Sequence, residues 1–327
     1  MNLPIIIGSI ILFVTVFLLL RYLPLKDKLL GKDRGKKFVQ GSNVNVGKPT
    51  GVGIYFMSSF LLFALIFCFI SGIKSIGCLL LIPVIAIEML SGYFDDISAA
   101  PWGEYIKGFL DFIISGIAAL VFVLNFDTKI FLIYTNQSFR INPIIYFVLA
   151  FILMIVSINA TNATDGVDGL SGTLSVLTTA SFMIIAYLRG TLDTLGIVWG
   201  LFFIIVLIAY LIFNHYPSKM LMGDAGSRSI GIFIALYAML LKVPFMYLIL
   251  GLPFLLDGGI SILKITIGRI TDKVFHKKIL ILKNIRTPLH DHLKKEMKFS
   301  APKTMIIISL SALILDILAI LLLIIVK

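Results

Sequence analysis

The chain has 327 residues, of which 59% are hydrophobic and only 14% charged, and its mean hydropathy is +1.05. Because soluble domains are about 45–50% apolar and about 25% charged, these values exclude a soluble multidomain enzyme, a disordered chain and a disulfide scaffold. The formal net charge is +11. We assign this excess to loops beside an anionic membrane leaflet rather than to a nucleic-acid partner. The chain is expected to be an all-α polytopic protein, with residues 1–327 forming one integral membrane domain.

Ten segments are predicted to be membrane-spanning helices, each of which needs about 20 mostly apolar residues. In chain order they lie near residues 3–20, 51–72, 76–94, 108–125, 143–160, 169–188, 194–213, 229–241, 245–263 and 304–326. The eighth is the shortest. We retain it because its removal would move the strongly basic loop 264–303 to the opposite side of the membrane.

The positions of Lys and Arg predict the orientation of these spans. If the N-terminus is outside, all but six of the 28 Lys and Arg residues fall in inner loops, most of them in segments 21–50 and 264–303. Lys107, Lys219 and Arg228 complete this inner set. The positive-inside rule therefore places both termini outside.

Two segments between the spans are also expected to be structured. In an outer loop, Lys129–Tyr134 and Phe139–Asn142 flank a polar tetrapeptide, which predicts a small extracellular β-hairpin. In the last inner loop, Val274–Ile285 mixes apolar residues with three lysines. That pattern is typical of an interfacial helix lying on the membrane surface.

On this topology, every polar cluster suited to chemistry falls on the inner side. The clusters are Asp95 and Asp96 at the end of the third span, Asp165 and Asp168 after the fifth, Asp224 after the seventh, and His290 and His292 in the last inner loop. The topology itself depends only on Lys and Arg, so this convergence is independent of it. It predicts one cytoplasm-facing site assembled from several loops.

The aspartate clusters have functional and structural interpretations. The adjacent carboxylates of Asp95 and Asp96 cannot both ionise cheaply without a cation, which favours a base or a metal site over a solvated helix end. Asp165 and Asp168 share a face if their turn is helical, and the glycines beside them let the backbone approach a ligand closely. A helix cap would explain only one of these two carboxylates.

The other clusters also point to a hard cation. Asp224 lies between glycines before a helix, where it can reach such a cation, although an ordinary N-cap turn has the same pattern. His290 and His292 suit phosphate or metal contact, or belong simply to a basic loop. Because no cysteine joins these clusters and the acids are oxygen donors, Mg²⁺ or Mn²⁺ is expected rather than Zn²⁺.

Together, the motifs resemble the polyprenyl-phosphate N-acetylhexosamine-1-phosphate transferase superfamily. The aspartate pair, Asn162–Leu170 and Met222–Ser227 match its adjacent-Asp, Asn-x-Thr-Asp-Gly-x-Asp-Gly-Leu and Met-Gly-Asp-x-Gly-Ser motifs. Lys48–Gly53 and Pro288–His292 are similar to the Thr-Pro-Thr-Met-Gly-Gly and Pro-Leu-His-His-His-Phe-Glu motifs of members that act in peptidoglycan synthesis. The resemblance covers nearly the whole chain.

The chain also departs from these motifs. Asp291 replaces the middle histidine, Lys294 stands at the glutamate position, and Ala99 replaces a lysine. Leu221 stands where a phenylalanine near uracil is usual, and Asp257 stands where the ninth span has a glutamate. These changes leave the implied reaction type unchanged and weaken the assignment to the peptidoglycan branch.

The resemblance implies transfer of phospho-MurNAc-pentapeptide from UDP-MurNAc-pentapeptide to undecaprenyl phosphate in the inner leaflet, giving lipid I and UMP. It implies Mg²⁺ held by Asp224, with Asp95 as the base acting on the lipid phosphate and Asp96 supporting it. Lys107, equated with the family's downstream lysine, and the catalytic His290 would offset negative charge. Substrate binding is assigned to Lys48, Thr50, Lys107, Asn162, Asp165, Asp168, Asn214, Leu221, Gly223 and His292, with Asp168 on the uracil. A homodimer in the bacterial cytoplasmic membrane is also implied.

Two alternative functions remain open at this point. A sibling transferase would move GlcNAc-1-phosphate to the same lipid, and assays with both UDP-sugars would separate the two activities. A cation-coupled transporter would use membrane acids such as Glu88, Asp257 and Asp316, but transporters usually show paired repeats and none is evident in this sequence. Direct attack and an aspartyl-phosphate intermediate are both compatible with the motifs.

Overall fold

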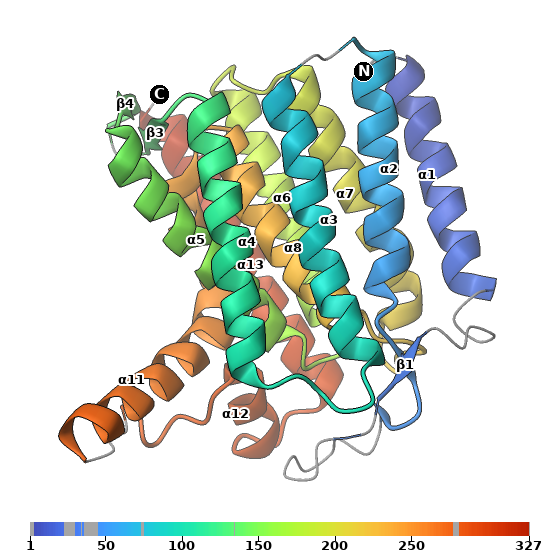
Figure 1. Ribbon diagram of the computed structural model, residues 1–327, viewed down its shortest axis with the longest axis vertical. Helices are drawn as coiled ribbons and strands as arrows, with labels where there is room; N and C mark the ends of the chain where they lie inside the picture. The colour runs from blue at the N-terminus through green and yellow to red at the C-terminus, as the bar shows by residue number, and fades with distance from the viewer. Residues whose placement is uncertain are drawn as a thin grey trace.

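The computed structural model describes residues 3–22, 30–33, 35, 45–72, 75–133, 135–276 and 281–326, which form a helical bundle (Figure 1). Eight of the described helices are long and apolar enough to cross a membrane. They are α1 (Leu3–Tyr22), α2 (Gly53–Ile70), α3 (Ile76–Ile97), α4 (Glu104–Asn125), α5 (Pro143–Thr164), α6 (Leu170–Leu188), α7 (Thr194–Asn214) and α13 (Ala301–Val326). The prediction of a helical, multi-pass membrane protein is therefore confirmed.

The ninth predicted span is broken into two halves that bend by 62°. It comprises the 3-10 turn η2 (Pro244–Met246), α9 (Tyr247–Leu250), α10 (Leu252–Phe254), the π-helical turn η3 (Leu255–Gly259) and α11 (Ile260–Phe275). Pro253 cannot donate to the helical ladder, and a π turn adds a residue to it, so both features favour a kink here. As a result α11 projects away from the bundle, and only Ser261 and Gly268 are buried in it (Figure 1).

The predicted interfacial helix over Val274–Ile285 is wrong in its described part. The helix α11 ends at Phe275, and His276 takes a left-handed φ of +50°. Residues 281–285 form bends and turns, while residues 277–280 lie outside the described residues. A right-handed helix cannot continue through a left-handed residue, which explains the early end.

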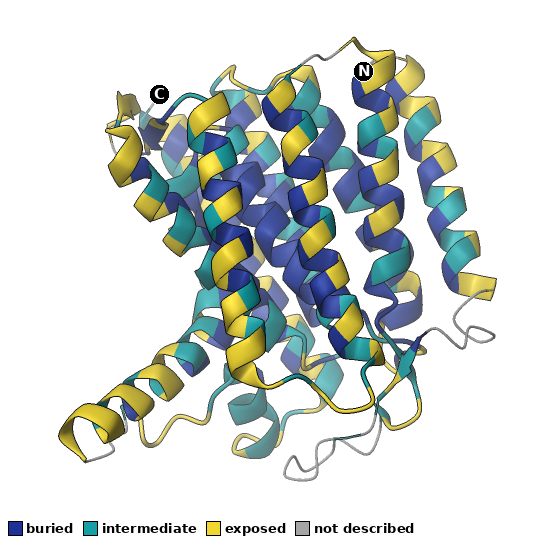
Figure 2. Ribbon diagram, in the orientation of Figure 1, coloured by how far each residue is buried: buried dark blue, intermediate teal, exposed yellow. Residues whose placement is uncertain are grey.

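The eighth predicted span corresponds to α8 (Gly223–Leu240), which lies in the buried centre of the bundle (Figure 2). Every residue from 225 to 239 is buried, and a Cβ on Gly231 would lie 2.6 Å from the Ile158 Cα of α5. Arg228 is buried inside this helix, so placing it among the inner-loop charges is wrong. Because the first turn of α8 is polar, length and composition support only eight or nine spans among the described residues. The count of ten stays a prediction.

Two small sheets lie at opposite ends of the bundle (Figure 1). Strands β3 (Lys129–Leu132) and β4 (Gln137–Arg140) pair antiparallel within the segment where a hairpin is predicted, with Tyr134 between them outside the described residues. Strands β1 (Gly31–Lys32) and β2 (Pro49–Thr50) form a second antiparallel pair, which the sequence did not predict. This pair brings Gly31 beside Thr50 and the end of α3.

Both ends of the described chain lie at the end of the bundle that carries β3 and β4 (Figure 1). The short helix α12 (Leu289–Lys295) lies at the opposite end, where α3 and α5 end and α4, α6 and α8 begin. That end of the bundle therefore collects the loops that carry the predicted site residues.

Candidate active site

Four helix ends bring five of the predicted site residues into one cluster. The cluster consists of Asp95 and Asp96 from α3, Lys107 from α4, Asn162 from α5 and Asp224 from α8. The helices approach closely because glycines lie where they meet: a Cβ on Gly92 would overlap the Asp224 carbonyl, and a Cβ on Gly53 would overlap the Gly226 nitrogen. Motifs far apart in the sequence therefore meet at the end of α8.

Lys107 bridges two carboxylates from different helices. Its Nζ lies 2.5 Å from Asp95 Oδ2 and 2.8 Å from Asp224 Oδ2. The Asp95 carboxylate is buried, and its other oxygen accepts a hydrogen bond from the Trp102 nitrogen at 2.5 Å. The ammonium therefore compensates carboxylates that could not both remain ionised in a partly buried site without a cation.

The second oxygen of Asp224 is also held. The Asn162 side-chain amide donates to Asp224 Oδ1 at 2.9 Å and to Ser227 Oγ at 2.9 Å. Asn162 and Lys107 thus bind opposite oxygens of one carboxylate and fix its orientation. This places the Asn-x-Thr-Asp-Gly motif and the Met-Gly-Asp motif in direct contact.

The adjacent aspartates have different partners. Asp96 accepts hydrogen bonds from the backbone nitrogens of Asp224 at 3.0 Å and Ala225 at 2.9 Å, so it caps the start of α8. The close approach requires Gly223, whose φ is +67° and where any Cβ would overlap the Asp96 carboxylate. Asp96 therefore orients the backbone of Asp224, whereas Asp95 faces Lys107.

His290 is held by a carboxylate that was not predicted to be its partner. Asp257, in the π turn η3, accepts the His290 backbone N–H at 2.6 Å, and its other oxygen lies 2.8 Å from His290 Nδ1. This pairing assigns the ring proton to Nδ1 and leaves Nε2 directed at Gly166, where a Cβ would overlap the ring. The imidazole is thus buried against the loop that follows α5.

Asp291 and His292, which follow His290 in α12, have different partners from His290. His292 Nδ1 accepts from the Arg286 nitrogen at 3.3 Å, and Asp291 pairs with Lys295 at 2.7 Å along α12. Burial opposes ionisation of Asp291, but the hydrogen bond from Lys295 and nearby positive charges hold the pKa of its carboxyl below its usual range. Asp291 therefore serves as half of a local ion pair.

A second group of predicted binding residues surrounds the loop 215–222. Asp168 Oδ2 accepts from the Ser218 nitrogen at 2.9 Å, and Lys48 Nζ donates to Ser218 Oγ at 2.9 Å. Asn214 is buried, with its oxygen accepting from the Gly169 nitrogen at 2.9 Å and its amide donating to the Met220 carbonyl at 2.9 Å. Asn214 therefore ties the two loops together.

Three further predicted residues lie beside these groups. Leu221 exchanges backbone hydrogen bonds with Pro49 and Val52, next to Thr50 in β2. Asp165 is half-buried at the end of α5, and its nitrogen donates to the Asn162 carbonyl at 3.2 Å. The structure therefore links the Lys48–Gly53 segment to the start of α8.

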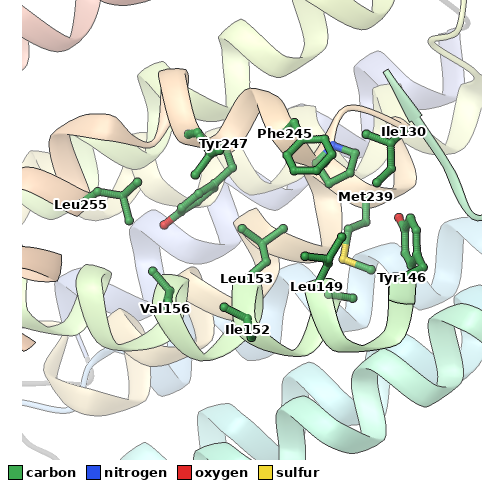
Figure 3. Close-up of a pocket in the computed structure, with 13 residues that line it drawn as sticks. Ile130, Tyr146, Leu149, Ile152, Leu153, Val156, Met239, Phe245, Tyr247 and Leu255 are labelled. Carbon is green, nitrogen blue, oxygen red and sulfur yellow. The ribbon is translucent and has the colours of Figure 1, made fainter. Parts of the chain in front are cut away.

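An apolar pocket of 240 Å³ lies apart from the charged cluster, between α5 and the elements η2 and α9 (Figure 3). Its lining includes Leu149, Ile152 and Leu248, which are exposed on the outside of the bundle. No charged side chain lines it among the described residues. The pocket is suited to an apolar chain and not to phosphate chemistry.

The acids of the transporter alternative each have a separate partner. Glu88 lies 3.0 Å from Arg228, Asp257 holds His290, and Asp316 accepts from Ser181 Oγ at 2.8 Å. The sequence did not reveal these pairings, because each joins residues distant in the chain.

Comparison with known proteins identifies the family. A model of glycosyl transferase family 4 matches residues 76–242, which include the charged cluster. The chain is 33% identical over 315 residues to a phospho-N-acetylmuramoyl-pentapeptide-transferase of Treponema pallidum (strain Nichols), covering 91% of this chain and 84% of that protein. A protein of the same name from Streptococcus thermophilus (strain CNRZ 1066) is 28% identical over 280 residues, covering 82% and 80%. The chain therefore belongs to glycosyl transferase family 4 and, within it, to the phospho-N-acetylmuramoyl-pentapeptide-transferases.

Proposed function

We propose that the protein transfers phospho-MurNAc-pentapeptide from UDP-MurNAc-pentapeptide to undecaprenyl phosphate, with lipid I and UMP as products. The observation that carries this proposal is the Asp95–Lys107–Asp224 cluster, in which three helices meet at one end of a membrane bundle. A water-soluble anionic donor and a lipid phosphate can meet only at a membrane interface. The relatives named for this reaction support the same substrates.

Charge neutralisation is the main task of such a site, because one anionic phosphate attacks another. The lipid phosphate oxygen forms a bond to the sugar-bearing phosphorus, and the bond from that phosphorus to UMP breaks. Lys107 lies between Asp95 and Asp224, where its ammonium can neutralise charge on the transferred group. Asp95 accepts the proton of the attacking phosphate in this proposal.

The chemistry of the cluster fits Mg²⁺. The carboxylates of Asp95 and Asp224 contact the ammonium of Lys107, and the Asp96 carboxylate lies against the backbone of Asp224, so carboxylate oxygens are grouped at this point. No three His, Cys, Asp or Glu side chains within the described part of the chain could form a metal cage by themselves. Mg²⁺ usually takes one or two carboxylates and completes its shell with water and substrate phosphates. Asp224 would hold it, and the bound ion would neutralise the diphosphate as a Lewis acid.

The loop 215–222 is proposed to hold the uridine. Asp168 is fixed there by the Ser218 nitrogen, and a carboxylate so oriented can accept a hydrogen bond from the uracil N–H. Leu221 offers an apolar surface instead of an aromatic one, so polar contacts carry more of the recognition of the base.

His290 is proposed to act on the phosphate side. Asp257 fixes its ring, so Nε2 is directed at Gly166, in the loop that directly follows α5, the helix that supplies Asn162 to the charged cluster. A positioned imidazole can offset phosphate charge or donate a proton.

The protein is proposed to lie in the bacterial cytoplasmic membrane as a homodimer, with ten spans, both termini and the β3–β4 sheet outside and the site facing the cytoplasm. Two observations support this orientation: the positive-inside distribution, and the position of both termini at the end of the bundle opposite α12 (Figure 1). The apolar pocket along α5 would then face lipid chains.

The test is UMP release by the purified protein in detergent, with UDP-MurNAc-pentapeptide, undecaprenyl phosphate and Mg²⁺. Parallel reactions contain UDP-GlcNAc as donor, omit the lipid phosphate, or use the Asp224→Asn variant. We expect release only with the pentapeptide donor and the lipid together, and loss of release in the variant. Release with UDP-GlcNAc alone would favour the sibling transferase.

A further inference from the structure

A second charged group lies within the membrane bundle, deeper along the same helices than the active-site cluster. Arg228 Nη2 lies 3.0 Å from Glu88 Oε1 and also contacts Asp111 Oδ1. Asn159 donates its amide to the other oxygen of Asp111 at 3.1 Å. The side chains of Arg228 and Glu88 are 2% and 0% exposed, so this group is enclosed by the bundle.

The two groups repeat one arrangement on the same four helices. The site layer consists of Asp95, Lys107, Asn162 and Asp224, and the buried layer of Glu88, Asp111, Asn159 and Arg228. Each of α3, α4, α5 and α8 supplies one residue to each layer. Both layers place one cation between two carboxylates, and in both an asparagine of α5 donates to one carboxylate.

The spacing explains why the layers are in register. Lys107 and Asp111 are four residues apart in α4, as are Asp224 and Arg228 in α8, so each pair lies on one face of its helix, about one turn apart. Moving α3 or α4 relative to α8 would therefore disturb both layers together.

Stability alone does not account for the buried layer. Removing charges from water costs free energy that a buried ion pair regains only with excellent geometry, so apolar residues of similar volume often serve as well or better. Here the geometry is incomplete, because Arg228 Nε and Nη1 have no hydrogen-bond acceptor among the described residues. A directional constraint on helix position is the property that apolar packing would not supply.

We propose that Arg228 is a positioning residue for the transfer reaction. By contacting Glu88 and Asp111 it ties α3 and α4 to α8 below the site, and so sets the separation of Asp95 and Asp224 that Lys107 bridges. This inference rests on the proposed function and deepens it, since it assigns the geometry of the catalytic cluster to residues that do not touch the substrates.

The test requires variants that remove the buried layer without leaving a lone charge. Arg228→Met alone would leave two uncompensated carboxylates and is expected to misfold. The triple variant Glu88→Gln/Asp111→Asn/Arg228→Met has no charge at these three positions, and the new side chains are similar in volume to those they replace. Asn159→Ala is a milder change that keeps all three charges. Asp316→Asn alters a buried carboxylate in α13 and serves as the matched control.

Four quantities are measured in each variant: the thermal midpoint in detergent, kcat for UMP release, KM for UDP-MurNAc-pentapeptide, and the rate at which acetic anhydride acetylates Lys107. Peptide mass spectrometry follows the acetylation. For the triple variant we expect KM within about threefold of the parent, kcat at least about tenfold lower, and acetylation of Lys107 at least about threefold faster. Asn159→Ala should shift both rates in the same directions by less, and Asp316→Asn should shift neither.

The acetylation rate does not depend on turnover, so it tests the position of Lys107 even if the parent protein releases no UMP. The absence of UMP release from the parent would refute the proposed function and not this inference. Unchanged kcat and unchanged Lys107 acetylation in both the triple and Asn159→Ala variants would overturn the inference. So would losses of kcat that match the loss of folded protein in each of them, because the buried layer would then be structural only.

Discussion

The Lys107→Met substitution tests whether the Lys107 ammonium stabilises the transition state by offsetting negative charge in the site. Lys107 Nζ lies 2.5 Å from Asp95 and 2.8 Å from Asp224. At an effective dielectric constant of about 20, a unit ion pair 2.8 Å apart is worth about 6 kcal/mol before desolvation is counted. Desolvation offsets part of this, and breaking a buried pair typically costs about 3–5 kcal/mol. If about 3 kcal/mol of that falls on the transition state, kcat decreases by about 10²-fold.

The assay compares kcat and KM for UMP release by Lys107→Met with those of Lys107→Arg, which keeps the charge, and of Lys273→Met. Lys273 is exposed on α11 and serves as the matched control. We expect the loss in kcat for Lys107→Met, a smaller loss for Lys107→Arg and none for Lys273→Met. A kcat for folded Lys107→Met within about threefold of the parent at every Mg²⁺ concentration would show that the ammonium does not stabilise the transition state.

Three further predictions concern other parts of the site. Asp257→Asn should lower kcat by about tenfold or more while the protein stays folded, because His290 loses the carboxylate that orients its ring. Steady-state kinetics measure this, and an unchanged kcat would mean that the Asp257–His290 pair has only a structural role. Gly223→Ala should destabilise the protein by about 1–3 kcal/mol, since a left-handed φ and the Asp96 carboxylate both oppose a Cβ; thermal unfolding measures this. Asp168→Ala should weaken UMP binding in calorimetry by about tenfold, or about 1.4 kcal/mol, with little change in Mg²⁺ dependence. Unchanged UMP affinity would remove Asp168 from the uridine site.

Hydropathy predicted the bundle well, because the helices have exposed residues along their length (Figure 2) and many of these exposed residues are large and hydrophobic. It was less informative for α8, where the prediction began at residue 229 and the helix begins at Gly223. The first turn of α8 is polar but packs against other helices rather than lipid. An apolar window reports suitability for lipid contact, so it misses a helix end that is buried within the protein.

The motifs predicted that their polar residues lie at one end of the bundle, because the topology placed their loops on one side, but they did not predict which of these residues are in contact. Asp95, Lys107, Asn162 and Asp224 are in contact, whereas Asp168 accepts from Ser218 and His292 accepts from Arg286. The motifs did not predict that Asp96 would cap α8, since the two adjacent carboxylates are equivalent in sequence until their side chains diverge.

Two pairings were beyond sequence reasoning for a different reason. Asp257 reaches His290, 33 residues away, only because the broken ninth span turns the π-helical segment toward α12. The sequence predicts Arg228 to be a loop charge, because charge alone does not show whether a partner is buried beside it. Both required the three-dimensional packing of residues distant in sequence.

In the proposed function, the Asp95–Lys107–Asp224 cluster performs phosphosugar transfer between a nucleotide carrier and a membrane lipid. The most direct test of this function follows radiolabelled UDP-MurNAc-pentapeptide with undecaprenyl phosphate and Mg²⁺ in detergent, where no membrane gradient exists. We expect label in the lipid fraction together with an equimolar amount of UMP, and neither product from an Asp224→Asn variant that is shown to be folded. Label transfer by Asp224→Asn at the rate of the parent would contradict the role of Asp224. Label transfer by the parent without release of UMP would contradict the proposed reaction.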